Sequence, residues 1–281
     1  MTREITLGIS PCPNDTFIFG PLITGRVSLP RTLIRAHIAD VEELNGLACN
    51  GALDVVKISV HAYLDVWRDY CLLPAGGAIG RGVGPIMVSR RRMSGDELKN
   101  ARVAIPGKRT TANLLLELSG LHSGERVEMV FHEIMPAVQK GLVDAGVVIH
   151  EGRWTYNSYG LTCVCDLAEM WENMTGLPLP LGVIALRRGF PEGFAEAIKD
   201  AIRESILYSR KHTDEVMTLI RRYAQEMDDW IIMKHIDSFV NEFSLDVGQE
   251  GRRAVRTILQ KACRKLDVAE PESVFYDDDG L

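Results

Sequence analysis

A histidine that directly follows a predicted buried strand is well placed for chemistry. Residues 145–149 form a short apolar run that is β-branched at its end, which is typical of a buried strand, and His150 and Glu151 follow it. In open α/β sheets, ligands bind beyond the carboxyl ends of the strands. An imidazole titrates near neutral pH, so His150 could act there as a general base. A lone histidine more often caps a helix or packs at the edge of the core. Whether His150 has a functional role therefore depends on the residues at the other strand ends.

Polar groups also follow three other predicted strands. The strand at 4–10 ends in a loop with two prolines, and Asn14 or Asp15 can cap the helix predicted at 16–23. A strand, a polar loop and a helix N-terminus together present N–H donors to an anionic ligand. The same arrangement is predicted after the strands at 54–58 and 102–105. The donors expected at these ends are Ser10, Lys57 with Ser59, and Thr110 with Thr111. Ser59 could equally be a helix cap.

The composition is that of a globular protein and argues against a nucleic-acid-binding or membrane protein. The chain has 281 residues, 46% hydrophobic and 25% charged, with a net charge of -6, which fits a globular protein with a full core and offers no basic surface for nucleic acid. No apolar run reaches the length of a membrane span, and the N-terminus lacks a signal-peptide pattern. We therefore expect a cytoplasmic protein with no nucleic-acid or membrane partner. The sequence leaves the oligomeric state open.

The cysteines predict neither a metal site nor a disulfide framework. The six cysteines form no CxxC pair and no zinc-finger spacing. Cys12 lies in the first loop, between two prolines, and no histidine is its neighbour in the sequence. We expect it not to be a catalytic nucleophile, because a thiol needs an adjacent base.

The order of the elements predicts an α/β fold. Residues 102–149 read strand, helix, strand, helix, strand, which implies a parallel sheet with right-handed crossovers. Extended segments near 84–89 and 177–183 suggest that two strands join a second lobe, residues 88–183, to a first lobe, residues 1–87 and 184–281. The glycine-rich string 76–84 is predicted to be flexible or to approach other backbone closely, residues 127–131 to be a strand, and the tail 276–281 to be disordered.

Seven segments, in this order, resemble one known family. They are SPCPNDTFIF at 10–19, KIS at 57–59 with AY at 62–63, GRGVGP at 80–85, PG at 106–107 with TTA at 110–112, IHE at 149–151 with TY at 155–156, LPLPLG at 177–182, and NEFSLD at 241–246. They are similar to the 1,4-dihydroxy-6-naphthoate synthases of the futalosine route to menaquinone. The match runs from about residue 4 to 265.

The resemblance implies a fold, a reaction and a site. The fold is a two-lobed α/β fold like that of type II periplasmic binding proteins, with a central cleft and a two-strand hinge. The reaction is a base-assisted elimination that converts cyclic dehypoxanthinylfutalosine into 1,4-dihydroxy-6-naphthoate and a sugar fragment, as a carbon–carbon lyase without metal or organic cofactor. The proposed base is His150, and the substrate-contacting segments fall on Lys57, Ile58 and Ser59 and on Thr111 and Ala112. The pair Val60-His61 departs from the small residue expected after Ser59, which bears on the fine substrate contacts.

Two alternatives stay open at this point. One is chorismate dehydratase of the same pathway, and the other is a cytoplasmic ligand-binding module of the same fold. Among the other histidines, His132 follows a predicted strand and is the strongest rival of His150. His61, His212 and His235 lie in predicted helices, where a packed or solvated role is the default expectation.

Overall fold

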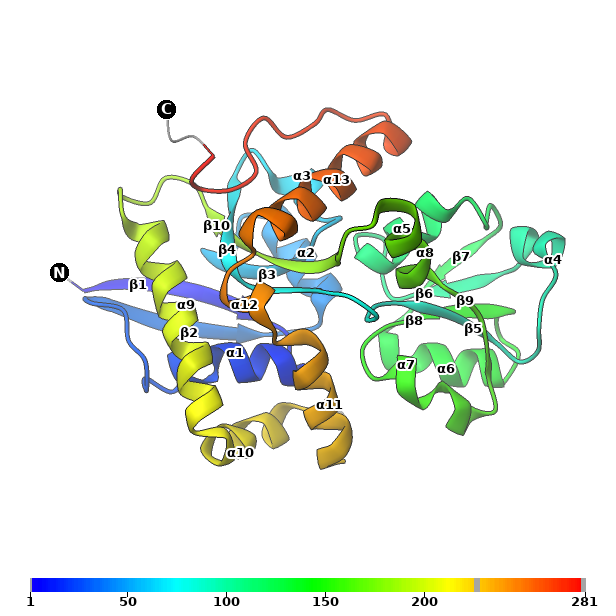
Figure 1. Cartoon of the computed structure of the whole chain (residues 1–281), viewed down its shortest axis with the longest axis horizontal. Coiled ribbons are helices and arrows are strands. Elements are labelled where there is room, and N and C mark those ends of the chain that lie inside the picture. Colours follow the sequence, from blue (N-terminus) through cyan, green and yellow to red (C-terminus); the bar gives the residue numbers. More distant parts are fainter. Residues whose placement is uncertain (1, 225–227, 279–281) are drawn as a thin grey trace.

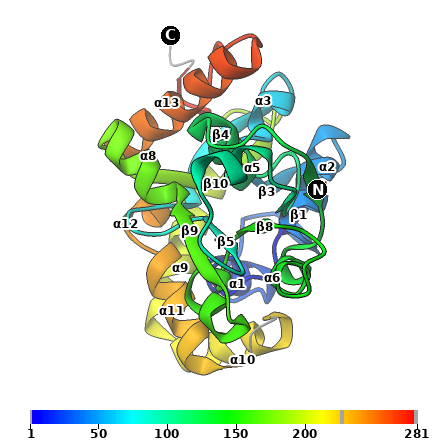
Figure 2. The same cartoon turned by 90° about the vertical axis from the view of Figure 1, so that its right-hand side faces the viewer.

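Two lobes, each built on a five-stranded sheet, make up the computed structural model (Figure 1). The structure describes residues 2–224 and 228–278. Two segments cross between the lobes near the middle of Figure 1, and Figure 2 looks along the molecule with the second lobe in front. This arrangement is the two-lobed α/β fold that the sequence predicted.

The first sheet has the strand order β2-β1-β3-β10-β4. Its strands are β1 (Arg3–Ile9), β2 (Thr32–Ile38), β3 (Val55–Ser59), β4 (Tyr70–Gly80) and β10 (Leu179–Arg187). Strand β1 pairs in parallel with β2 and β3, whereas β10 runs antiparallel to β3 and β4. The carboxyl ends of β1 and β3 therefore lie at one edge, where Ser10 and Ser59 are found.

The second sheet has the order β7-β6-β8-β5-β9. Its strands are β5 (Ile86–Ser89), β6 (Val103–Ile105), β7 (Arg126–Glu128), β8 (Ala145–Val148) and β9 (Thr162–Asp166). Strand β6 is parallel to both β7 and β8, which confirms the strand–helix–strand unit predicted for residues 102–149. Strand β5 is antiparallel to β8 and β9.

The helices cover both sheets and form the C-terminal third of the chain. They are α1 (Pro13–Ile23), α2 (Val41–Cys49), α3 (Tyr63–Val66), α4 (Gly95–Asn100), α5 (Thr111–Ser119), α6 (Phe131–Gln139), α7 (Gly152–Thr155), the short 3-10 helix η1 (Tyr156–Tyr159), α8 (Leu167–Thr175), α9 (Phe194–Lys211), α10 (Thr213–Tyr223), α11 (Asp229–Phe239), α12 (Glu242–Leu245) and α13 (Gly248–Leu266). Helices α9 to α13 pack around the first lobe (Figure 1).

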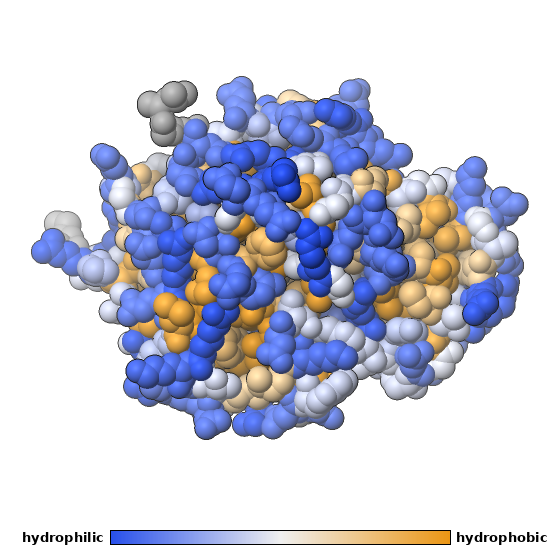
Figure 3. All heavy atoms as spheres, viewed as in Figure 1, coloured by the Kyte–Doolittle hydropathy of each residue, from blue (hydrophilic) through white to orange (hydrophobic). Residues whose placement is uncertain are grey.

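The molecular surface is mostly hydrophilic on the face shown in Figure 3, with apolar residues visible between the helices and over part of the second lobe. No helix within residues 2–224 and 228–278 is long and apolar enough to cross a membrane.

The two crossover segments between the lobes, residues 81–85 and 176–178, touch each other. Arg81 Nη2 donates to the carbonyl of Gly176 at 2.9 Å, and the backbone N–H of Gly82 donates to Glu172 Oε1 at 2.7 Å. Strand β5, which begins at Ile86, already belongs to the second sheet, and β10 returns to the first sheet at Leu179. We therefore propose lobe boundaries at these crossovers, a few residues before the boundaries at 87/88 and 183/184 that the sequence predicted.

The close-approach alternative predicted for the glycine-rich string is confirmed. Strand β4 continues through Gly80, a Cβ at Gly77 would lie 3.1 Å from the carbonyl oxygen of Gly182, and one at Gly76, with φ of 81°, would lie 2.9 Å from Ile184. Two other local predictions differ from the structure. The strand predicted at 127–131 is shorter, and Phe131 begins helix α6, so that His132 lies in a first helical turn.

The second difference is the C-terminal tail, residues 276–281, which was predicted to be disordered. Phe275 is buried and pairs with Leu72. Asp278 accepts hydrogen bonds from the backbone N–H groups of Val274 and Phe275 and forms an ion pair with Arg256. Residues 276–278 are therefore ordered, and the rest of the predicted tail, 279–281, lies outside the described residues.

Candidate functional site

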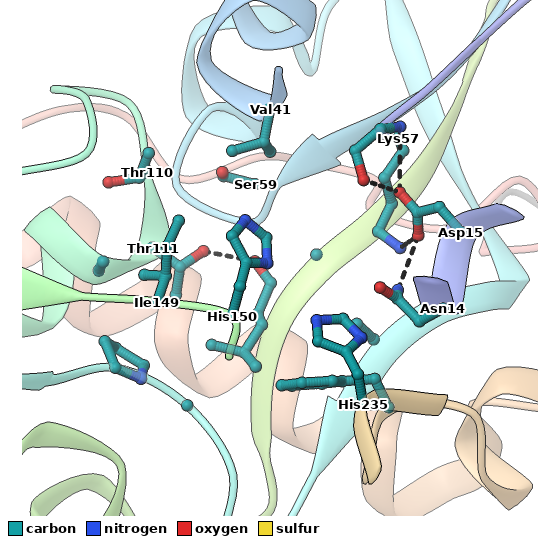
Figure 4. A pocket seen from close by; sticks show the side chains of 18 residues that line it. Asn14, Asp15, Val41, Lys57, Ser59, Thr110, Thr111, Ile149, His150 and His235 are labelled. Carbon is teal, nitrogen blue, oxygen red and sulfur yellow. Dashed lines mark hydrogen bonds and ion pairs between the residues drawn. The ribbon is translucent and has the colours of Figure 1, made fainter. Parts of the chain in front are cut away.

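A pocket lies between the two lobes, and its empty volume of about 650 Å³ includes space that is open to solvent. Figure 4 shows it from close by. Its lining comes from both lobes: Ser10, Asn14, Asp15, Val41, Lys57, Ser59, Ala78, Gly84, Pro85, Thr110, Thr111, Ala112, Ile149, His150, Leu181, Gly182, His235 and Phe239.

The predicted site residues converge here, with the exception of Ile58. Side chains alternate along a strand, so Lys57 and Ser59 of β3 point to one face and Ile58 to the other. The Ile58 side chain is fully buried in the hydrophobic core and does not line the pocket. The prediction that the Ile58 side chain contacts the substrate is therefore wrong, because this side chain packs in the core.

A buried polar network holds the first-lobe side of the pocket together. Asp15 Oδ1 accepts from Lys57 Nζ at 2.6 Å and from Asn14 Nδ2 at 2.8 Å, and Asp15 Oδ2 accepts from Ser10 Oγ at 2.7 Å (Figure 4). Asp15 is 1% and Lys57 5% exposed. Neither Asn14 nor Asp15 is the predicted helix cap, because α1 begins at Pro13, with Cys12 at the N-cap position. The pairing of Asp15 with Lys57 leaves this wall close to neutral.

Hydroxyl groups and a helix N-terminus form another wall. Thr110 is the N-cap of α5 and accepts from the backbone N–H of Asn113, which places the first turn of α5 at the pocket. Thr111 Oγ1 donates to the carbonyl of Leu181 at 2.6 Å. Ser59 is not the cap of α3, which begins at Tyr63; its Oγ accepts from Asn45 Nδ2 at 3.2 Å. These groups can bind a carboxylate or ring hydroxyls.

Val60 and His61, where the sequence departs from the family pattern, do not line the pocket. They contribute to the contact between the two lobes. Val60 is fully buried, and His61 Nδ1 lies 3.2 Å from the carbonyl oxygen of Thr110. Burial lowers the pKa of His61, so its neutral ring can donate to that carbonyl. The pair thus supports the position of α5.

His150 has a backbone conformation that few side chains adopt. Its φ is 55°, in the left-handed region, immediately after β8. Phe131 lies edge-on to its ring, 4.8 Å between centroids. Non-glycine residues in this region cluster at active sites, where the surrounding structure enforces the conformation. The backbone therefore directs this imidazole into the pocket, and part of the residue remains accessible.

Cys12 lies against the ring of His150. The sulfur is 3.5 Å from Nδ1 and 3.8 Å from Nε2. Sequence neighbours could not reveal this contact, because 138 residues separate the two. Burial alone would lower the pKa of His150, but the charge and hydrogen bond of Cys12, with smaller contributions from Glu151 and Asp40, raise it to about 9.

His235 is the polar residue of the pocket lining that the sequence interpretation missed. It lies on α11, is 2% exposed, and stacks on His150 with 5.9 Å between ring centroids. Within the described residues, neither of its ring nitrogens has a hydrogen-bond partner. Burial and the positive charges of His150 and Lys57 lower its pKa well below the ordinary value. A signal was present: position 235 falls on the apolar stripe of α11 between Ile232 and Phe239.

Among the described residues, no three His, Cys, Asp or Glu side chains are grouped as metal ligands would be. The expectation of a reaction without metal or organic cofactor stays a prediction.

The fold and the interlobe pocket together define a class. Two α/β lobes joined by two crossovers, with a small-molecule pocket between them, are the architecture of the periplasmic-binding-protein-like proteins. The aliphatic sulphonate binding protein of Escherichia coli superimposes with a TM-score of 0.67 at 14% identity, covering 98% of this chain and 90% of its own. A likeness at that identity concerns the fold alone.

The family follows from closer relatives. The family model described as menaquinone biosynthesis matches residues 5–264, and the chain belongs to that family. A 1,4-dihydroxy-6-naphthoate synthase of Thermus thermophilus is 46% identical over 97% of this chain and 99% of its own. One of Streptomyces coelicolor is 42% identical over 92% of both. A solved protein of Archaeoglobus fulgidus, 35% identical, has a TM-score of 0.88 over 94% of this chain and 98% of its own.

Proposed function

We propose that this chain acts as a 1,4-dihydroxy-6-naphthoate synthase in menaquinone biosynthesis. Relatives of that name cover nearly the whole chain. In the finer form of the proposal, the substrate is cyclic dehypoxanthinylfutalosine of the futalosine route, and the reaction is a carbon–carbon lyase-type elimination that releases a sugar fragment. A location in the cytoplasm is part of the same proposal.

The observation that carries the mechanism is His150 beside hydroxyls and helix N–H groups contributed by both lobes. Ser59, Thr111 and the first turn of α5 can hold a carboxylate or polyol, while His150 exchanges a proton with it. Most of the lining is buried, which strengthens hydrogen bonds to a bound substrate. The sequence-based role of His150 as the general base is kept as part of this proposal.

Mass analysis of products from the purified protein tests the proposal. Incubation with cyclic dehypoxanthinylfutalosine should yield 1,4-dihydroxy-6-naphthoate without added metal or cofactor. A parallel incubation with chorismate should leave that compound unchanged. Turnover of the second substrate alone would assign the chain to the dehydratase. Tight binding of the first substrate without product would indicate a ligand-binding module.

A further inference from the structure

One part of the pocket wall combines apolar side chains with a buried imidazole. Ala78, Leu181 and Phe239 line the pocket and belong, with Trp154, to one apolar cluster. The ring of His235 lies among them, 4.7 Å from the ring of Phe239 and 6.1 Å from that of Trp154 between centroids. Apolar and aromatic side chains with one polar group between them suit an aromatic ligand that carries a polar substituent.

The two ring nitrogens of His235 are available to such a ligand. The residue is 2% exposed, lines the pocket, and has no hydrogen-bond partner on either nitrogen within the described part of the chain. Buried polar groups in native proteins are nearly always hydrogen-bonded, so an exception at a pocket calls for a functional explanation. Packing alone gives none, because an apolar side chain would suit the neighbouring ring of Phe239 better than an unpaired imidazole.

The chemistry of this ring matches a hydroxyl group better than a carboxylate. Burial, His150 and Lys57 lower the pKa of His235 well below its ordinary value, so the ring is neutral at pH 7. A neutral imidazole has one donor nitrogen and one acceptor nitrogen, and a hydroxyl group can both donate and accept. An ionised carboxylate only accepts, and it would gain no positive charge from this ring.

A site for a carboxylate lies on another side of the same pocket. Figure 4 shows Thr110 and Thr111 on one side and His235 on the other, with His150 between them in that view. The N-terminus of helix α5 lies at the two threonines and favours a negatively charged group. A ligand with a carboxylate at one end and a hydroxyl at the other would therefore extend past His150.

We propose that His235 is a specificity-determining residue that hydrogen-bonds a ring hydroxyl of the bound naphthoate, whose carboxylate lies at the N-terminus of α5. The proposal rests on the proposed function, because the product named there carries two hydroxyls on one ring and a carboxylate on the other. It deepens that function by giving the orientation of the ligand and by adding a binding residue that no sequence motif indicated. The role of His150 as the base is unchanged.

A ligand bound in this orientation contacts both lobes. His235 lies on α11 of the first lobe, whereas α5 belongs to the second. The hydrogen bond to His235 therefore contributes to the affinity for the ligand and to the contact between the lobes. Removing it should weaken binding of a hydroxylated ligand and leave binding of a ligand without hydroxyls nearly unchanged.

Calorimetry with two ligands tests the proposal. The probes are 1,4-dihydroxy-6-naphthoate, kept free of oxygen, and naphthalene-2-carboxylate, which has the same rings and carboxylate but no hydroxyls. A site that hydrogen-bonds a hydroxyl discriminates against the analogue that lacks it. The parent should bind the hydroxylated compound roughly 10- to 100-fold more tightly, and His235→Phe should reduce this preference by about tenfold or more.

Two further variants separate recognition from structure. His235→Gln keeps a donor and an acceptor in its side-chain amide and should retain part of the preference. His132→Phe, at an exposed position outside the pocket, is the matched control and should keep the preference of the parent. Because neither nitrogen of His235 has a partner among the described residues, His235→Phe should be at least as stable to heat as the parent.

Three results would overturn the role of His235. The first is a His235→Phe variant that keeps the preference of the parent for the hydroxylated compound. The second is a parent that forms product and yet binds both compounds equally. The third is a His235→Phe variant that loses affinity for the substrate but not for 1,4-dihydroxy-6-naphthoate, which would assign the ring to the sugar portion. A parent that forms no product would instead refute the proposed function.

Discussion

The left-handed backbone of His150 costs free energy that an ordinary loop residue would avoid. A non-glycine residue there is unfavourable by ~1–3 kcal/mol, although His and Asn tolerate it better than most. Contacts of the ring with Cys12 and with the stacked ring of His235 offset this cost. This residue can therefore be replaced by Asn with little change to the backbone.

We expect His150→Asn to reduce kcat/KM by ~10²–10⁴-fold, because positioned acid–base groups contribute that much. The melting temperature should change little, since Asn adopts a positive φ readily. Product formation and thermal unfolding are measured on the same preparations. Parent-like turnover in this variant together with loss of turnover in His132→Asn would show that the catalytic histidine was misassigned.

We expect Cys12 to shift the pKa of His150 without attacking the substrate. Burial lowers the pKa of His150 and Cys12 raises it, so in Cys12→Ala the burial effect should dominate and the pKa should fall from about 9. The part of the kcat/KM profile that reports the ionisation of His150 should then move to lower pH. Cys12→Ser should keep most of the turnover at its optimum, with Cys49→Ser, an exposed thiol, as the control. Inactivity of both Cys12 variants at every pH, with the fold intact, would instead indicate a nucleophile.

The hydroxyls of Ser59 and Thr111 should contribute to binding more than to chemistry. Removing a buried hydrogen-bonding group costs ~1–3 kcal/mol, which is roughly one to two decades in Kd. Ser59→Ala and Thr111→Ala are therefore expected to weaken substrate or product binding by that amount in calorimetry. Ser123→Ala, an exposed serine outside the pocket, serves as the control. Unchanged affinity in both pocket variants would place the ligand elsewhere.

At the scale of elements, one carboxylate ties α1 to the end of β1 and to β3. Asp15, in the first turn of α1, accepts hydrogen bonds from Ser10 and from Lys57. Both members of the Asp15–Lys57 pair are almost completely buried. Breaking such a pair from one side leaves an uncompensated buried charge, whereas replacing both members with apolar residues is often neutral.

Asp15→Ala should accordingly lower the free energy of unfolding by ~3–5 kcal/mol. The double variant Asp15→Leu with Lys57→Met should lose much less stability, although it disrupts the pocket. Denaturant unfolding measures both. Glu125→Ala removes an exposed partner of Arg102 and should cost no more than ~1 kcal/mol. An equal loss of unfolding free energy in the single and double variants would contradict this explanation. It would mean that the hydrogen bonds of the Asp15 carboxylate, and not the balance of buried charge, stabilise the fold.

At the scale of the whole molecule, hydrogen bonds and an ion pair join the two lobes. Arg109, in the loop before α5, donates through Nε to Asp65 of α3 at 3.0 Å and through its backbone N–H to Glu42 of α2 at 3.1 Å. Most pocket residues are buried in this arrangement. We expect the lobes to separate when substrate enters and to close around it, which would exclude water from the reacting groups.

We expect product or an analogue to compact the protein in solution, as measured by small-angle scattering. Arg109→Ala removes the side-chain ion pair with Asp65 and should enlarge the radius of gyration of the unliganded protein, while the liganded form remains compact. Lys99→Ala, exposed on α4 of the second lobe, is the control. A radius of gyration that is the same with and without product would contradict the closing motion.

The sequence by itself determined the elements and the loops of this protein. Apolar periodicity located the parallel unit in residues 102–149, and polar residues at strand ends led to Ser10, Lys57, Ser59, Thr110, Thr111 and His150, all of which line one pocket. These signals are local, because a strand, its turn and the following helix cap are encoded within about ten residues of one another.

Only the tertiary structure decided which of these groups touch. The Cys12–His150 contact joins the lobes, and Asp15 turned from a predicted cap into the partner of Lys57. His235 looked like a packed helical residue until α11 was placed beside His150. Such contacts depend on packing between segments far apart in the chain, and the charges that set an imidazole's protonation act through space, so no local pattern carries them.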